Sequence, residues 1–167
     1  APRISANVGL LLYYARQYNQ ALEELSRTLE LDPYHVAAHE YFGYVYAETG
    51  EYEKSISSFR QSIDLEKSNA EMSTDIAYVY ALAGSKEKSR EMLDNIINYS
   101  KQSFISSVSI ASVFQALGEK GQVFAWLEKA YSERDAGLVD LKVNPRFDAV
   151  CSDPRFKELL KKIGLEK

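Results

Sequence analysis

Apolar and small residues recur along the chain at a spacing of 34 positions. The first column of this pattern holds only small residues, namely Gly9, Gly43, Ala77 and Ala111. A second column, three positions later, holds mostly large apolar residues, namely Leu12, Tyr46, Tyr80 and Phe114. Residues three apart lie on the same face of a helix. A period of this length, kept over four units without an insertion, predicts an array of small helical repeats.

Glycines and a further pair of columns mark where each unit turns. Gly50, Gly84 and Gly118 follow the small column by seven residues, where the first helix of a unit must end in a residue that tolerates positive φ. Arg16 stands at this place in the first unit. Beyond the turn, a small residue is followed four positions later by a large apolar one, in the pairs Ala21 and Leu25, Ser55 and Phe59, Ser89 and Leu93, and Val123 and Leu127. This arrangement predicts a second helix in each unit.

The pattern resembles the tetratricopeptide repeat, a pair of antiparallel helices that stacks on its neighbours. The resemblance covers about residues 2–134 and implies an all-α fold, an α-solenoid of four helix pairs. We expect the repeats to occupy residues 1–134, with units at about 2–34, 35–68, 69–102 and 103–134. The proline that usually closes each unit is present only at Pro33.

Residues 135–167 follow a different pattern and are expected to cap the array. Asn144-Pro145-Arg146-Phe147 recurs nine residues later as Asp153-Pro154-Arg155-Phe156, and Asn or Asp before Pro is a helix-start signal. An apolar face that ends at Gly164 predicts a capping helix near residues 154–163. This closing segment resembles that of tetratricopeptide arrays at the C-terminus of bacterial multi-domain regulators. A helical pattern that begins by Ile4, with no initiator Met, is expected of a piece of a longer chain.

Composition and charge exclude several classes of protein. Hydrophobic residues make up 46% of the chain and charged ones 26%, as in soluble globular proteins, so disorder is not expected. The net charge of −4 argues against a surface built for nucleic-acid phosphates. No run of about 18 apolar residues exists, so no membrane-spanning helix is expected. One cysteine cannot form an internal disulfide, and we expect a cytoplasmic protein.

Candidate catalytic and metal-binding residues are few. His35 and His39 have a spacing that could present two imidazoles to a metal, but no third ligand is indicated, and packing is the favoured interpretation. Cys151 has no histidine close in sequence, so a small buried hydrophobic residue is favoured over a nucleophile. We therefore expect no enzyme activity, no cofactor and no metal site.

Two arginines of the closing segment could recognise an anion. Arg146 and Arg155 are instead expected to pair with Asp148 and Asp153, or to cap the array.

The resemblance implies that the first helices of the units line a concave groove that binds peptides. When the groove positions of the family are transferred to this sequence, six residues are candidates for the groove, namely Tyr13, Glu40, Tyr41, Tyr44, Asp75 and Tyr78. Tyrosine offers a large contact area with a polar tip, which suits an interface, although several of these rings could merely pack between helices. Relatives that capture acidic tails hold cations in columns where this chain has Glu71 and Asp75, so acidic tails are disfavoured.

We therefore predict a protein- or peptide-binding module, the scaffold or sensor part of a larger bacterial protein. Its partner would be a neutral to basic segment with an apolar anchor, and neither nucleic acid nor membrane. The alternative is a dimerisation or structural segment of a transcriptional or signalling regulator, with the tyrosines on a self-interface.

Overall fold

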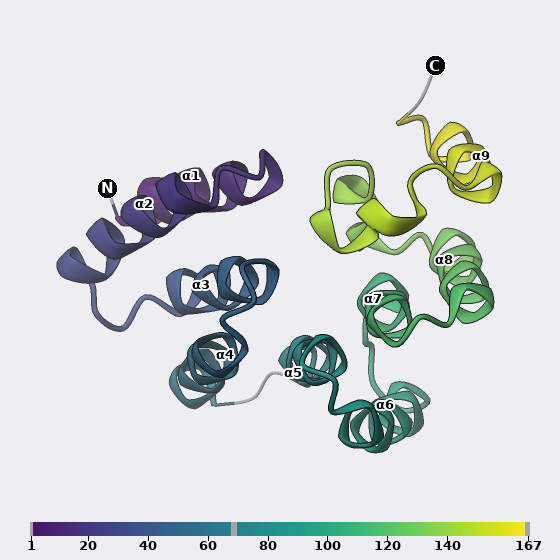
Figure 1. Cartoon of the computed structure of the whole chain (residues 1–167), viewed down its shortest axis with the longest axis horizontal. Coiled ribbons are helices and arrows are strands. Elements are labelled where there is room, and N and C mark those ends of the chain that lie inside the picture. The colour runs from purple at the N-terminus through teal and green to yellow at the C-terminus, as the bar shows by residue number, and fades with distance from the viewer. Residues whose placement is uncertain (1, 68–69, 166–167) are drawn as a thin grey trace. The chain divides into compact units, whose positions relative to one another are not determined.

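The computed structural model describes residues 2–67 and 70–165, and these contain helices and no strand (Figure 1). The α-helices are α1 (Pro2–Tyr14), α2 (Tyr18–Leu31), α3 (Val36–Glu48), α4 (Tyr52–Glu66), α5 (Met72–Leu82), α6 (Lys86–Ser100), α7 (Ser107–Leu117), α8 (Lys120–Glu133) and α9 (Pro154–Lys162). Two 3-10 helices, η1 (Ala136–Asp140) and η2 (Pro145–Val150), lie between α8 and α9. The expected all-α fold is confirmed, and α9 coincides with the expected capping helix.

The chain forms two compact units, residues 1–72 and 73–167. Unit 1 contains α1 to α4, and unit 2 contains α5 to α8 together with the closing segment. The boundary between the compact units thus falls after the second helix pair. The finer division into four repeat units stays a prediction.

The small columns allow the two helices of a pair to approach closely. A Cβ atom built on Gly43 would lie 2.5 Å from Cε1 of Phe59, so only glycine leaves room for that ring. The hydroxyl of Ser55 in α4 donates to the Gly43 carbonyl at 2.7 Å, and that of Ser89 in α6 donates to the Ala77 carbonyl at 2.8 Å. A small residue on one helix therefore meets a small residue on the other, and in two pairs a hydrogen bond joins them.

The turns between paired helices adopt the left-handed backbone that the sequence predicts. Gly50, Gly84 and Gly118 have φ values of 80°, 83° and 82°. Arg16, at the equivalent place after α1, also takes a positive φ of 58°, which a side chain with a Cβ adopts at a cost. Its guanidinium donates to the Tyr14 carbonyl, which ties the long side chain to the end of α1.

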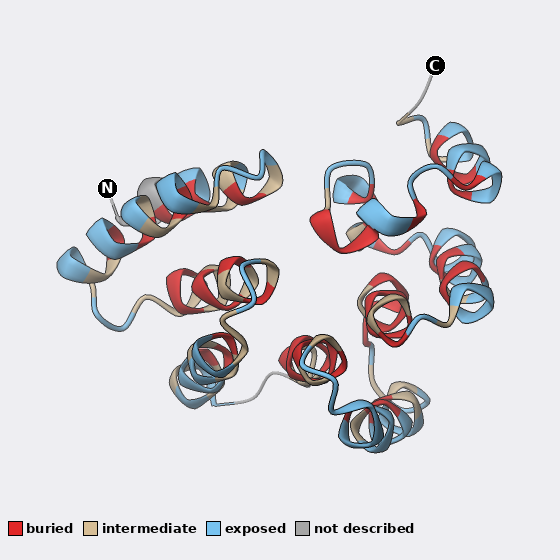
Figure 2. Ribbon diagram, viewed as in Figure 1, coloured by how far each residue is buried: buried red, intermediate tan, exposed pale blue. Residues whose placement is uncertain are grey.

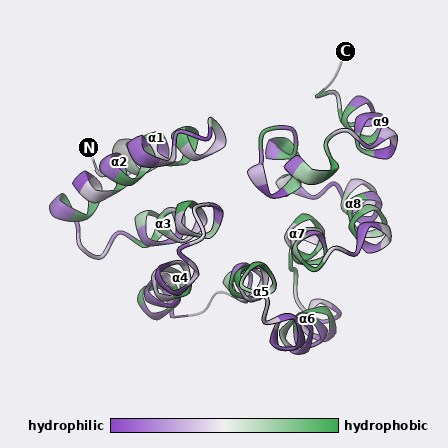
Figure 3. Ribbon diagram, viewed as in Figure 1, coloured by the Kyte–Doolittle hydropathy of each residue, from purple (hydrophilic) through white to green (hydrophobic). Residues whose placement is uncertain are grey.

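Burial differs between the first and the second helices of the pairs (Figure 2). In unit 2, α5 and α7 are buried or half-buried over most of their surface, whereas α6 and α8 expose one whole side. The hydropathy colouring follows the same division, with apolar residues gathered on α5 and α7 (Figure 3). The core of unit 1 includes Ala21 and Leu25 of α2 together with Phe42 and Val45 of α3.

The closing segment begins each of its helical turns with a side-chain cap. Asp135, Asn144 and Asp153 each accept a hydrogen bond from the backbone N–H two residues further on. Phe147 and Phe156 follow two of these caps, and both are buried with their ring centroids 6.3 Å apart. The repeated Asn/Asp-Pro-Arg-Phe sequence therefore makes the same turn twice and buries its phenylalanine both times.

Candidate functional site

A cluster of tyrosines occupies unit 1, where α1 meets α2 and α3. We call Tyr13, Tyr14, Tyr18, Tyr41 and Tyr44 the tyrosine cluster. The ring centroid of Tyr13 lies 5.4 Å from Tyr14, 6.2 Å from Tyr18 and 5.7 Å from Tyr44. Tyr13 is buried, whereas the other four are half-buried. Tyr13 is therefore one of the rings that pack between helices rather than face a groove.

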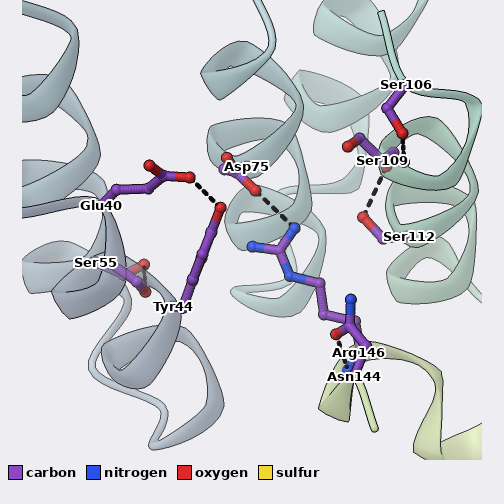
Figure 4. A network of polar contacts seen from close by, with 10 residues as sticks. Glu40, Tyr44, Ser55, Asp75, Ser106, Ser109, Ser112, Asn144 and Arg146 are labelled. Carbon is purple, nitrogen blue, oxygen red and sulfur yellow. Dashed lines mark hydrogen bonds and ion pairs between the residues drawn. The ribbon is translucent and has the colours of Figure 1, made fainter. Parts of the chain in front are cut away.

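Two of the half-buried tyrosines of this cluster lie on α3 beside a carboxylate. Tyr41 and Tyr44 have their ring centroids 5.9 Å apart, and the Tyr44 hydroxyl donates to Oε1 of Glu40 (Figure 4). Phe59 of α4 supports the Tyr44 ring from within the unit, at 5.6 Å between centroids. Glu40, Tyr41 and Tyr44, all half-buried, are called the Glu40–Tyr44 face below.

The other two candidate residues lie in unit 2, around an arginine of the closing segment. Nη1 of Arg146 lies 2.6 Å from Oδ1 of Asp75, and the two side chains are only 7% and 8% exposed (Figure 4). The guanidinium carbon of Arg146 lies 4.3 Å from the ring centroid of Tyr78, which is buried as well. The expectation that Asp75 and Tyr78 line an open groove is therefore wrong, because both are buried beside Arg146.

Burial and charge act in opposite directions on the Asp75 carboxyl group. Removal from water raises its pKa, and this effect outweighs the nearby Arg146 guanidinium, which lowers the pKa. The hydrogen bond from Arg146 favours the charged carboxylate further. Separating the two side chains would leave a buried charge without its partner, which is energetically costly. The ion pair therefore keeps Arg146 beside Asp75.

Local structure of the closing segment places Arg146 at this site. Asn144 caps η2 by accepting from the Arg146 backbone N–H at 3.1 Å, and Pro145 occupies the first turn. Phe147, directly after Arg146, is buried in unit 2. These contacts hold the backbone on both sides of Arg146. Sequence reasoning did not name Asp75 as its partner, since the two are 71 positions apart.

The second copy of the motif makes a related contact. The guanidinium carbon of Arg155 lies 4.0 Å from the ring centroid of Phe124, and Arg155 pairs with Asp153, as expected. Lys120 also contacts Asp153, at 2.9 Å. The hydrogen bonds from Arg155 and then Lys120 hold the pKa of Asp153 well below its usual range. Both copies thus place an arginine against an aromatic ring and a carboxylate.

The histidines and the cysteine take other roles. Nδ1 of His35 accepts from the Ala38 N–H and so caps α3, and Nε2 of His39 lies 2.9 Å from the Pro33 carbonyl, which accepts. Within residues 2–67 and 70–165, no three His, Cys, Asp or Glu side chains gather as a metal site would require. Cys151 is exposed, so the expectation that it is buried is wrong. Nor does this part of the chain contain a helix long and apolar enough to cross a bilayer.

The comparisons with known proteins agree on the kind of repeat. The family model described as tetratricopeptide repeat matches residues 9–70. No curated protein sequence matches the chain.

Three solved structures are similar over nearly the whole chain. PilW, described as a widely conserved type IV pilus biogenesis factor, gives a TM-score of 0.58 at 16% identity, covering 99% of this chain and 79% of its own. YrrB, described as a TPR protein with an unusual peptide-binding site, gives 0.51 at 17%, covering 95% and 82%. A putative kinesin light chain of Podosopora anserina with nearly identical TPR-like repeats gives 0.55 at 15%, covering 98% and 95%.

These findings define the class of fold. Residues 9–70 match the tetratricopeptide repeat model, and the described residues have an all-α fold similar to that of these solved structures. At these identities the structural neighbours establish the fold alone.

Proposed function

We propose that the chain is a protein- or peptide-binding module, and that the Glu40–Tyr44 face binds a Lys or Arg side chain beside an apolar anchor. One observation carries this proposal. In unit 2 an arginine of the chain itself lies on a tyrosine ring next to a carboxylate, with a guanidinium-to-ring distance of 4.3 Å and an ion pair of 2.6 Å.

The repeat register relates that contact to the proposed site. Tyr44 and Tyr78 are 34 positions apart and so occupy the same column of the repeat. At Tyr78, the Arg146 guanidinium contacts both the tyrosine ring and the Asp75 carboxylate. At Tyr44, the tyrosine hydroxyl donates directly to the Glu40 carboxylate. The Glu40–Tyr44 face therefore offers the same pair of groups, and its half-buried side chains leave part of them accessible.

The physical chemistry of this face favours a cationic segment. A cation over a tyrosine ring gains about 0.5–2 kcal/mol, and more as the contact is desolvated. Tyr41, next to Tyr44 at 5.9 Å, adds apolar area for an anchoring side chain. The net charge of −4 would also attract a basic partner over distance.

This site is smaller than the groove that the sequence analysis predicted. Tyr13 supports it from beneath, while Asp75 and Tyr78 are held by Arg146 and are not part of it. We infer that the module acts by binding rather than by catalysis. The peptide-binding site named for YrrB supports this kind of role for the fold. A cytoplasmic location and a place in a bacterial regulator remain part of the proposal.

The proposal is tested by a peptide-array screen, followed by titration of the best basic hits. We expect Tyr44→Ala to weaken binding by at least about tenfold, as truncation of an aromatic hot spot does. Glu40→Gln should weaken binding and reduce its salt dependence, since one charge is lost. Tyr44→Phe keeps the ring, so its binding should lie between those of wild type and Tyr44→Ala.

Matched controls separate a local effect from a general one. Tyr34→Ala removes an exposed tyrosine outside the cluster, and Glu30→Gln removes an exposed carboxylate of α2. Both should bind as wild type does. Thermal melts confirm that each variant is folded. Hits that are acidic tails, or wild-type binding by both Tyr44→Ala and Glu40→Gln, would show that this face is not the site.

A further inference from the structure

Two arginines of the closing segment show how this chain holds a cation against an aromatic ring and a carboxylate. Arg146 lies over the ring of Tyr78 and pairs with a buried carboxylate, and its side chain is only 7% exposed. Arg155 lies over the ring of Phe124 and donates to Asp153 twice, from Nε at 3.1 Å and from Nη2 at 3.0 Å. In both contacts the flat guanidinium covers a ring while its N–H groups donate to a carboxylate.

Two lysines that contact a ring and a carboxylate stay largely in water. Lys54 lies over the ring of Tyr46 and pairs with a glutamate, and its side chain is 63% exposed. Lys129 lies over the ring of Trp126 and also pairs with a glutamate, with its side chain 45% exposed. An ammonium group is more strongly hydrated than a guanidinium, so its removal from water costs more. The most deeply buried of these four cations, Arg146, is accordingly an arginine.

The Glu40–Tyr44 face combines a ring and a carboxylate at a half-buried position. The Tyr44 hydroxyl donates to Oε1 of Glu40, so the carboxylate lies at the edge of the ring that carries the hydroxyl (Figure 4). A carboxylate accepts at up to about four sites, so the bond from Tyr44 does not exclude a further donor. A cation that contacts both the ring face and this carboxylate must extend past the ring edge. A planar guanidinium carries its N–H donors in its own plane and can do so, whereas an ammonium is a compact point charge.

We propose that the Glu40–Tyr44 face selects arginine over lysine, a specificity that rests on the proposed function of this face. The guanidinium plane lies on the Tyr44 ring, and its N–H groups donate to the Glu40 carboxylate. A lysine ammonium makes the ring contact or the contact with the carboxylate, and the half-buried position makes its loss of water more costly. Glu40 therefore determines the preference, because it rewards a donor that leaves the ring face in the plane of the guanidinium.

Isothermal titration calorimetry of the full chain with three forms of the best basic array hit tests this specificity. The three peptides are identical except that the basic position holds arginine, lysine or citrulline. We expect the lysine peptide to bind about fivefold more weakly than the arginine peptide, the worth of about one hydrogen bond. Citrulline keeps the planar group and loses the charge, so its peptide should bind at least about tenfold more weakly than the arginine peptide.

A pair of variants assigns the preference to Glu40. Glu40→Gln removes the charge that accepts from the guanidinium, so the ratio of the lysine to the arginine Kd should fall to about twofold or less. Glu30→Gln removes an exposed carboxylate of α2 and should keep the wild-type ratio. Thermal melts confirm that both variants are folded.

Failure of this specificity and failure of the proposed function give different results. Equal affinities for the arginine and lysine peptides, tighter binding of the lysine peptide, or an unchanged ratio in Glu40→Gln would overturn the arginine preference and leave a basic segment as the partner. An array that yields no basic hit, or a citrulline peptide that binds as tightly as the arginine peptide, would instead contradict the proposed function itself.

Discussion

Arg146 is one of the buried charged side chains of the closing segment. It forms a buried ion pair with Asp75, and its guanidinium lies over the ring of Tyr78. Arg155, with the same neighbours in sequence, pairs with Asp153 while its side chain stays 53% exposed. The two arginines of the repeated motif are therefore expected to contribute differently to stability, because Arg146 is buried and Arg155 is not.

The first prediction compares these two arginines. Arg146→Leu leaves the Asp75 carboxylate buried without its cation, and such a change typically costs about 3–5 kcal/mol. Arg155→Leu removes an exposed ion pair and should cost no more than about 1 kcal/mol. Urea unfolding of both variants gives the two free energies. Equal losses would mean that burial of the Asp75–Arg146 pair has no energetic consequence.

A second prediction concerns acid. The pKa of Asp153 in the folded protein lies well below its ordinary value of 3.8, because Arg155 and Lys120 donate to the carboxylate. A depressed pKa stabilises the folded state at pH values above the ordinary one, and this stabilisation is lost as the pH falls through the folded value. Asp153→Asn should therefore lower stability at pH 7 and reduce its decline between about pH 4 and pH 2. Thermal melts across this range test it, and parallel curves for variant and wild type would contradict it.

At the scale of elements, the close packing of α3 against α4 requires a residue without a side chain at position 43. The ring of Phe59 lies where a Cβ on Gly43 would be, at 2.5 Å. Gly43→Ala should therefore destabilise the protein by about 1–3 kcal/mol, as overpacking does, despite the better helix propensity of alanine. Gly121, near the start of α8, has open space around it. Gly121→Ala should stabilise by about 0.5–1 kcal/mol.

Chemical denaturation of the two glycine variants separates these effects. If Gly43→Ala were as stable as Gly121→Ala, the close approach of α3 and α4 would not constrain the sequence.

The helical elements are the part of the structure that periodicity predicts best. The spacing of small residues such as Gly43 and Ala77, and of the turn glycines, indicates where helices begin and end. Helices α3 to α8 occur at the places that this spacing indicates. The candidate site was predicted less well. Glu40 and Tyr44 are one helical turn apart, so their contact can be foreseen, whereas the burial of Tyr78 by Arg146 depends on the path of the closing segment.

At the scale of the molecule, the chain contains two compact units, and the closing segment belongs to the second. In repeat proteins each element is stabilised mainly by its neighbours. We therefore expect Phe147→Ala, which empties a buried ring position, to cost about 3–5 kcal/mol in unit 2. Amide hydrogen exchange should show faster exchange in α7 and α8, with α1 to α4 unchanged. Val143→Ala, at an exposed position, is the control.

Loss of protection of equal size in both units would contradict this prediction. It would show that the chain unfolds as one cooperative structure.

The sequence by itself determined the helical class, the turn glycines and the position of the last helix. All of these follow from interactions between residues within one or two helical turns, or from a spacing that repeats. Only the tertiary structure decided which candidate residues are accessible. Arg146 reaches Asp75 across 71 positions. Accessibility depends on what packs against a face, and that is a property of the folded chain rather than of local pattern.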